Sequence, residues 1–159
     1  MDYSVSTILF ASDLSGHAPE VARHAVGLAR QFGAKVHVLH VLEPIGDYAN
    51  SLITNYLPSD VLETVRQESY AAARKDMQQR LEKLCDDLDF DAAILADVKL
   101  LEGIPHRVIL DEASRINASL IVMGAHGHSA LGELLLGSVA HKVVMKSPVP
   151  VLLVPIKPD

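Results

Sequence analysis

The residues that point most directly to chemistry are three glycines and a serine in the last quarter of the chain. Gly124, Gly127, Gly137 and Ser138 follow the spacing Gly-x2-Gly-x9-Gly-Ser. Glycine tolerates positive φ angles and lets a backbone approach a ligand closely, so successive N–H groups can converge on phosphate oxygens. Ser138 stands where a short helix should begin, and a helix N-terminus attracts anions. The pattern predicts a phosphate-binding loop; the alternative is a loop whose glycines only make turns.

A second candidate pair, Ser12-Asp13, follows the first apolar run of the chain. In an open parallel sheet, ligands bind outside the carboxyl ends of the strands where the winding reverses. An aspartate directly after a strand can also form only an Asx turn. Asp13 is therefore predicted to face the glycine loop, with the turn role left open.

Other chemistries have weaker support. The pair His126 and His128 could suggest a metal, but Glu133 is the only nearby carboxylate, so we expect none. The sequence contains no GxxxxGK[ST] loop and no evident nucleophile beside a base. We therefore expect a bound phosphate compound to be hydrolysed slowly at most. The single cysteine, Cys85, lies in an amphipathic segment and is expected to be a buried apolar residue.

The elements that would position these residues alternate along the chain. Apolar runs predict strands at 5–11, 35–42, 92–101, 119–123 and 149–154. Helical periodicity predicts helices over 17–32, 60–88, 103–117 and 138–147, with Gly33 and Asn117 as left-handed stops. Asp60 and Glu63 are expected to form a capping box, and Ser138 to cap the last helix. Residues 43–58 show no clean period and are expected to form a long loop.

Strands that alternate with helices predict an α/β protein with one doubly wound, five-stranded parallel sheet covered by helices on both faces. The whole chain, residues 1–159, is expected to be a single nucleotide-binding domain.

Charge and hydropathy argue against two classes of partner. The formal net charge is −6 and no segment concentrates Lys and Arg, so we expect no binding to nucleic acid. The longest apolar runs are too short to span a bilayer, so we expect no membrane insertion. The N-terminus has no basic signal region, and we expect a cytoplasmic protein.

Several of these features together resemble a known family. The sequence resembles the ATP-binding branch of the universal stress protein family in four features. These are Asp13 at the end of the first strand, His40-Val41 at the end of the second, the glycine spacing and the SPVPVLLVP ending. The resemblance implies strand order 3-2-1-4-5. It also implies a regulatory stress-response protein that binds ATP, or ADP or AMP, with Mg²⁺ as a candidate companion ion.

The resemblance also assigns roles to single residues. Asp13 would bind adenine or ribose, and Val41 would contact adenine through its backbone. Gly124 and Gly127 would hold ribose and phosphate, and the segment 137–139 would hold the outer phosphates. The full candidate set is Ser12, Asp13, Val41, Met123, Gly124, Gly127, His128, Gly137, Ser138 and Val139. His128 stands where many members have Arg or Lys, which weakens the cation offered to phosphates near neutral pH.

The apolar strand 149–154 carries no charge, although prolines interrupt its surroundings. An edge strand of this kind can pair with a second copy, so a homodimer through residues 149–154 is expected. A regulatory protein partner, not identifiable from sequence, is expected as well. Two alternatives remain open, namely a nucleotide-free or AMP-binding interaction module and, less favoured, a slow ATPase.

Overall fold

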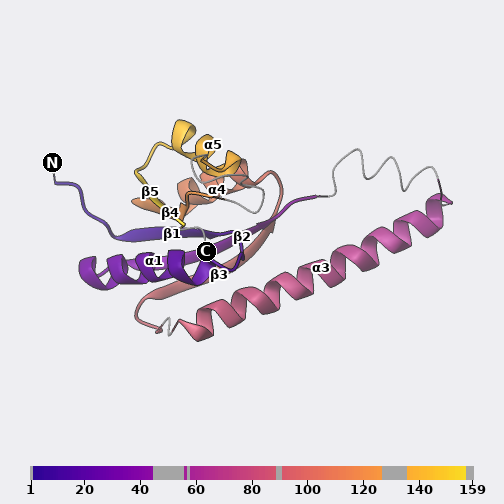
Figure 1. Ribbon diagram of the computed structural model, residues 1–159, viewed down its shortest axis with the longest axis horizontal. Coiled ribbons are helices and arrows are strands. Elements are labelled where there is room, and N and C mark those ends of the chain that lie inside the picture. The colour runs from indigo at the N-terminus through magenta and orange to yellow at the C-terminus, as the bar shows by residue number, and fades with distance from the viewer. Residues whose placement is uncertain (1, 45–55, 57, 89–90, 127–135, 157–159) are drawn as a thin grey trace.

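The computed structural model describes residues 2–44, 56, 58–88, 91–126 and 136–156. Its centre is a five-stranded parallel sheet in the order β3-β2-β1-β4-β5 (Figure 1). The strands are β1 (Thr7–Ser12), β2 (Lys35–Leu42), β3 (Leu95–Glu102), β4 (Leu120–Gly124) and β5 (Val151–Val154). The helices are α1 (Ala18–Phe32), α3 (Ser59–Asp87), α4 (Pro105–Arg115) and α5 (Ser138–Lys146). The predicted α/β fold and strand order are confirmed.

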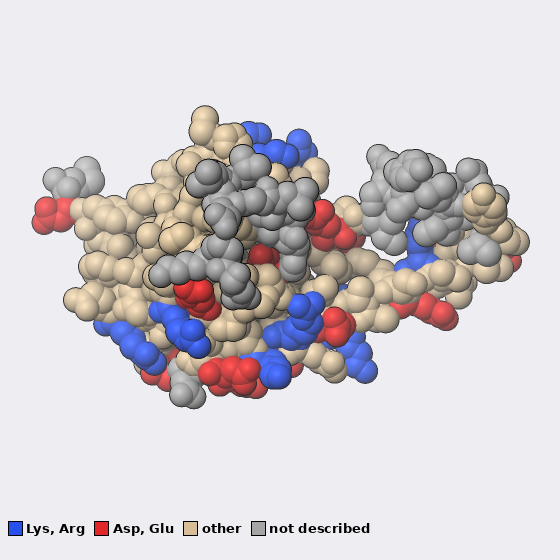
Figure 2. All heavy atoms as spheres, in the orientation of Figure 1, with Lys and Arg blue, Asp and Glu red and all other residues tan. Residues whose placement is uncertain are grey.

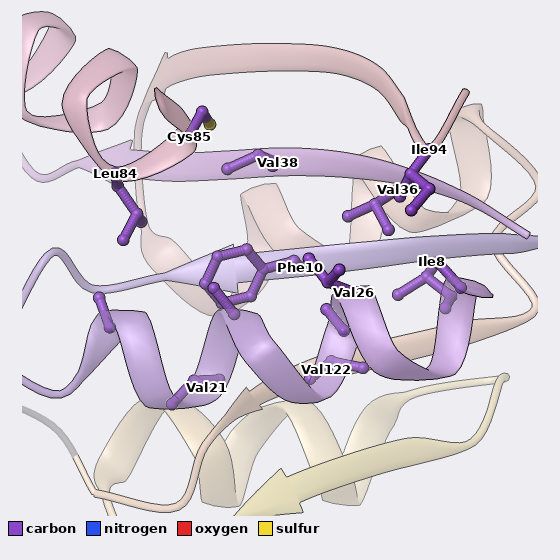
Figure 3. Packing of buried hydrophobic residues seen from close by; sticks show 14 of the residues in the cluster. Ile8, Phe10, Val21, Val26, Val36, Val38, Leu84, Cys85, Ile94 and Val122 are labelled. Atoms are coloured by element: carbon purple, nitrogen blue, oxygen red, sulfur yellow. The ribbon is translucent and has the colours of Figure 1, made fainter. Parts of the chain in front are cut away.

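Alternate strand residues divide the core into two layers, because successive side chains point to opposite faces of a sheet. On one face, Phe10 and Val38 are buried against α1 and the C-terminal part of α3 (Figure 3). On the other face, Leu9, Leu39 and Ile121 are buried against α4 and α5. Helices thus cover both faces, which explains why the central strands are mostly apolar.

Two helix ends follow the predicted left-handed stops. Gly33 adopts φ 67° directly after α1, and the N–H of this residue donates to the carbonyl of Ala29. Asn117 has φ 52° two residues after α4 ends at Arg115. Glycine and asparagine are the residues that adopt this conformation most readily, so both helix ends could be predicted from the local sequence.

The predicted capping box at the start of α3 is wrong. Pro58 is the N-cap residue, with ψ 146°, and no side chain caps the helix there. The N–H of Leu62 donates to the carbonyl of Pro58 at 2.8 Å, so the first turn begins before Asp60. Asp60 therefore lies inside the first turn, where its charge still favours the positive end of the helix dipole.

Strand β3 begins at Leu95, three residues later than predicted. The carboxylate Oδ1 of Asp91 accepts hydrogen bonds from the N–H groups of Ala93 and Ile94, at 2.8 and 3.1 Å. This Asx turn uses the N–H groups of Ala93 and Ile94, so the strand begins only after it, although the carbonyl of Ile94 accepts a hydrogen bond from the N–H of Val36 in β2.

Helix α3 is 29 residues long and extends beyond the sheet (Figure 1). Three of its buried residues, Leu81, Leu84 and Cys85, lie in its C-terminal third, which packs on the sheet, and a fourth, Leu62, lies near its start. Cys85 is buried, as predicted, and burial raises the pKa of its thiol to about 11.

On the face drawn in Figure 2, acidic and basic side chains are intermixed over α1 and α3. None of the helices in the described ranges has the length and apolar character that a bilayer crossing requires.

Candidate functional site

A cavity of about 220 Å³ lies at the carboxyl ends of β1, β2 and β4. Eight of the ten candidate residues line it: Ser12, Asp13, Val41, Met123, Gly124, Gly137, Ser138 and Val139. The other two, Gly127 and His128, lie outside the described residues. The chain reverses its winding here, because β1 has β2 on one side and β4 on the other, and this reversal opens a crevice between the connections.

The turn after β1 is held by its own side chains. The Ser12 hydroxyl oxygen accepts a hydrogen bond from the N–H of Leu14 at 3.1 Å. The Asp13 carboxylate oxygen Oδ1 accepts one from the N–H of Ser15 at 3.0 Å. The Asx turn considered from sequence is therefore present, and Asp13 also lines the cavity. These two roles are compatible, because a carboxylate accepts several hydrogen bonds.

His40 joins the two central strands at the cavity wall. Its Nδ1 lies 2.7 Å from the carbonyl oxygen of Ser12, and the side chain is buried. A carbonyl only accepts hydrogen bonds, so Nδ1 carries the hydrogen in this contact.

The backbone of Val41 points into the gap beyond β1. Strand β1 ends at Ser12, whose register partner is His40, so Val41 lies one residue past the last pair. The N–H of Gly103 donates to the carbonyl of Leu42, which shows that Leu42 faces β3. Neighbouring strand residues direct their backbone groups to opposite sides, so those of Val41 face the β1 side, where the cavity begins.

The N-terminus of α5 forms a third wall. The helix begins at Ser138 and its N-cap residue is Gly137, so the prediction that Ser138 is the cap is wrong by one position. Extended backbone at Gly137, with ψ 148°, places the boundary one residue earlier. The N–H groups of Ser138, Val139 and Ala140 belong to the first turn, where the helix supplies no acceptor for them. All three residues line the cavity.

Neither described glycine of the motif uses a positive φ. Gly137 has φ −58°, and in the described chain positive φ angles at glycine occur at Gly33 and Gly103. The conformational part of the argument for the loop is therefore wrong at Gly124 and Gly137. At Gly124 the reason is space, because an added Cβ would lie 3.3 Å from Cδ1 of Ile156.

Sequence reasoning missed several residues of the cavity wall. Glu43 and His126 line it, as do Pro105 and Ile109 from α4. Glu43 follows the end of β2, and the rule that selected Asp13 after β1 could have found it. The local sequence around Pro105 and Ile109 gives no indication of a binding site, because these residues reach the cavity only through the packing of α4 on the sheet.

The described residues that line the cavity include acidic side chains but no Lys or Arg. Asp13 and Glu43 contribute carboxylates, His40 and His126 contribute imidazoles, and no Lys or Arg lines the cavity within the described part of the chain. Phosphate groups would therefore meet backbone N–H groups and a helix dipole beside two acidic side chains.

Comparison with known families decides the classification. The model of the universal stress protein family matches residues 5–155. The chain belongs to the universal stress protein family. A universal stress protein of Thermus aquaticus, found in the QAH/OAS sulfhydrylase 3' region, is 36% identical over 149 residues, covering 93% of this chain and 97% of that protein.

Solved structures of universal stress proteins and their relatives share the fold. The structure of MJ0577, a universal stress protein of Methanocaldococcus jannaschii, is 28% identical, with a TM-score of 0.68 over 97% of this chain and 98% of that one. A universal stress protein in complex with cAMP is 21% identical, with a TM-score of 0.64 over 95% and 97% of the two chains. One from Archaeoglobus fulgidus in complex with dAMP is 22% identical, with a TM-score of 0.58 over 96% and 98%.

Proposed function

We propose that this universal stress protein binds an adenine nucleotide in the cavity and acts as a regulatory stress-response module of the ATP-binding branch. The observation that carries the proposal is the convergence of separate segments on one cavity. Asp13, Val41, Gly124 and the 137–139 segment are far apart in sequence, and all line it.

The cavity offers different chemistry to the two ends of a nucleotide. An apolar part of the cavity wall is suited to a purine ring, and it is formed by Val41, Met123, Pro105 and Ile109. The first turn of α5 offers N–H groups and a positive dipole end suited to phosphate oxygens. Two proteins of the same fold are solved with cAMP and dAMP, which supports an adenine nucleotide as the ligand class.

The charge of the lining bears on the form of the nucleotide. With Asp13 and Glu43 at the cavity, a triphosphate needs a cation to offset repulsion from the two carboxylates. We propose Mg²⁺ for that role when ATP is bound, with His128 as a weaker substitute for the Arg or Lys of other members. ADP and AMP would be less dependent on the cation.

Bound nucleotide would act by changing the surface offered to a regulatory protein partner, in a cytoplasmic homodimer formed through β5. Two other functions keep the same fold, namely a nucleotide-free or AMP-binding interaction module and a slow ATPase. The first would show no ATP affinity, and the second would release inorganic phosphate.

The deciding experiment has two parts. Mass spectrometry would identify nucleotide released from the purified protein, and calorimetry would then measure ATP, ADP and AMP with and without Mg²⁺. We expect micromolar binding of at least one adenine nucleotide and no comparable binding of GTP. If no adenine nucleotide copurifies or binds, the interaction-module alternative is correct.

A further inference from the structure

Arg80 reaches the turn after β1 from the C-terminal third of the long helix α3. Its guanidinium Nη2 donates a hydrogen bond to the carbonyl oxygen of Leu14 at 2.6 Å, across 66 residues of sequence. A hydrogen bond from a charged donor is stronger than one between neutral groups. Arg80 does not line the cavity described above. The hydrogen bond to Leu14 therefore connects Arg80 to the turn that carries Asp13.

Leu14 has an unusual backbone conformation. It adopts φ 57°, which L-amino acids other than glycine, asparagine and aspartate rarely adopt. Leucine has no polar side-chain group that could stabilise this conformation locally. The conformation is held by three contacts instead: the N–H donates to Ser12 Oγ, the carbonyl accepts from Arg80, and the side chain is 6% exposed in the cluster that contains Leu81.

The left-handed residue sets the position of Asp13. The carboxylate of Asp13 accepts its hydrogen bond from the N–H of Ser15, so the Asx turn spans Leu14. If Leu14 relaxed to a negative φ, the peptide between Leu14 and Ser15 would rotate. The N–H of Ser15 would then turn away from Asp13, and the carboxylate would lose this contact beside the cavity.

We propose that Arg80 is a positioning residue for the nucleotide site, which holds the left-handed Leu14 and thereby places Asp13. The proposal rests on the proposed nucleotide binding. Leu81 and Leu84 are buried beside Arg80 and anchor this part of α3 on the core. Helix α3 is thus coupled to the turn after β1 through the Arg80 hydrogen bond and through the packing of Leu14 in the cluster that contains Leu81.

Binding measurements test the proposal on the intact chain. Arg80→Met removes the charged donor and keeps most of the apolar stem, and Arg80→Lys restores one donor. Arg23→Met, an exposed arginine on α1, is the matched control. We expect Arg80→Met to weaken AMP binding about tenfold, the size of one charge-assisted hydrogen bond. Arg80→Lys should recover most of that loss, and Arg23→Met should change nothing.

Two further measurements separate positioning from general destabilisation. Inorganic tripolyphosphate, which lacks the adenosine that Asp13 would hold, should bind Arg80→Met and wild type equally. In an Asp13→Asn background, Arg80→Met should cost little more AMP affinity, because both changes affect one interaction. Equal weakening of AMP and tripolyphosphate, or fully additive losses, would overturn the proposal.

A measurement without any ligand tests the role of Arg80 in the turn independently of nucleotide binding. Amide hydrogen exchange at Ser15 should be faster in Arg80→Met than in wild type, because the N–H loses its fixed acceptor. If wild type bound no AMP, the nucleotide proposal would fail and the exchange rate would still decide the role of Arg80. Unchanged exchange at Ser15 would show that Arg80 does not hold the turn.

Discussion

The backbone N–H of Gly137 donates to the carbonyl oxygen of Ala125 at 2.8 Å, so the two ends of the segment between β4 and α5 lie side by side. This bond holds the N-terminus of α5 against the end of β4. The helix start therefore faces the cavity with a fixed geometry, and Gly137 lines the cavity at this point.

Replacing Gly137 tests the phosphate-binding loop. Its φ of −58° is accessible to any residue, so Gly137→Val should fold, with a cost of about 1 kcal/mol for a poorer helix cap. We expect ATP binding to weaken about tenfold or more by calorimetry, with Gly137→Ala intermediate. Gly27→Ala is the control, because a Cβ there meets nothing within 4 Å. Unchanged affinity in a folded Gly137→Val protein would falsify the assignment.

Asp13→Asn tests the ligand role of Asp13 apart from its turn role. The amide oxygen of Asn can still accept from Ser15, so the Asx turn is retained while the charge is lost. We expect weaker binding of adenosine-containing ligands and unchanged binding of inorganic tripolyphosphate. Unchanged binding of both ligands would mean that Asp13 acts only in the turn, and equal loss for both would contradict a contact between Asp13 and the adenosine part.

Glu43→Gln tests the proposed need for a cation. Removing one carboxylate from the cavity should strengthen ATP binding without Mg²⁺ about fivefold, and AMP binding less, because repulsion grows with phosphate charge. The experiment compares calorimetric affinities at two salt concentrations, since screening should reduce the difference. Glu68→Gln, on the exposed side of α3, is the control. Identical ATP affinities in Glu43→Gln and wild type would contradict this prediction.

The dimer prediction can be tested at the β5 edge. The N–H of Ile121 donates to the carbonyl of Pro150, so Pro150 faces β4 and the backbone of the next residue, Val151, faces outward. Val151→Pro removes an outward N–H while leaving the bonds to β4 in place. Light scattering at micromolar concentration should show a wild-type dimer and a variant that dissociates. A wild-type mass of 17.2 kDa at all concentrations would refute the dimer.

Glu112 predicts how stability depends on pH. Hydrogen bonds from Arg115 and Lys99 to this buried carboxylate lower its pKa below the ordinary 4.5. The folded state therefore gains stability that is fully present above pH 4.5 and is lost as pH falls through the lowered pKa. Because the side chains of Arg115 and Lys99 remain solvent-accessible, Glu112→Gln should cost only about 1 kcal/mol at pH 7 and should remove this acid dependence in urea unfolding. Asp111→Asn, exposed on the same helix, should keep the wild-type pH profile.

Local patterns in the sequence were enough for most of the elements. Gly33 and Asn117 ended their helices as expected, because their left-handed propensity is a property of the residue itself. Apolar runs located all five strands, because burial on both faces leaves a continuous apolar pattern. The strand order came from the family resemblance, because periodicity does not say which strands are neighbours.

Candidate site residues could be predicted from sequence in two situations. One is a polar residue at the end of a strand, as at Asp13, and the other is a set of glycines at a fixed spacing. The sequence by itself thus determined which segments could meet a ligand. Tertiary structure alone decided that the Val41 backbone faces the gap beyond β1, because this depends on the register of β2 against a strand that ends at Ser12. It also decided that Leu14 is left-handed and bonded to Arg80. No local propensity of leucine predicts this conformation, which depends on a donor that packing brings from 66 residues away.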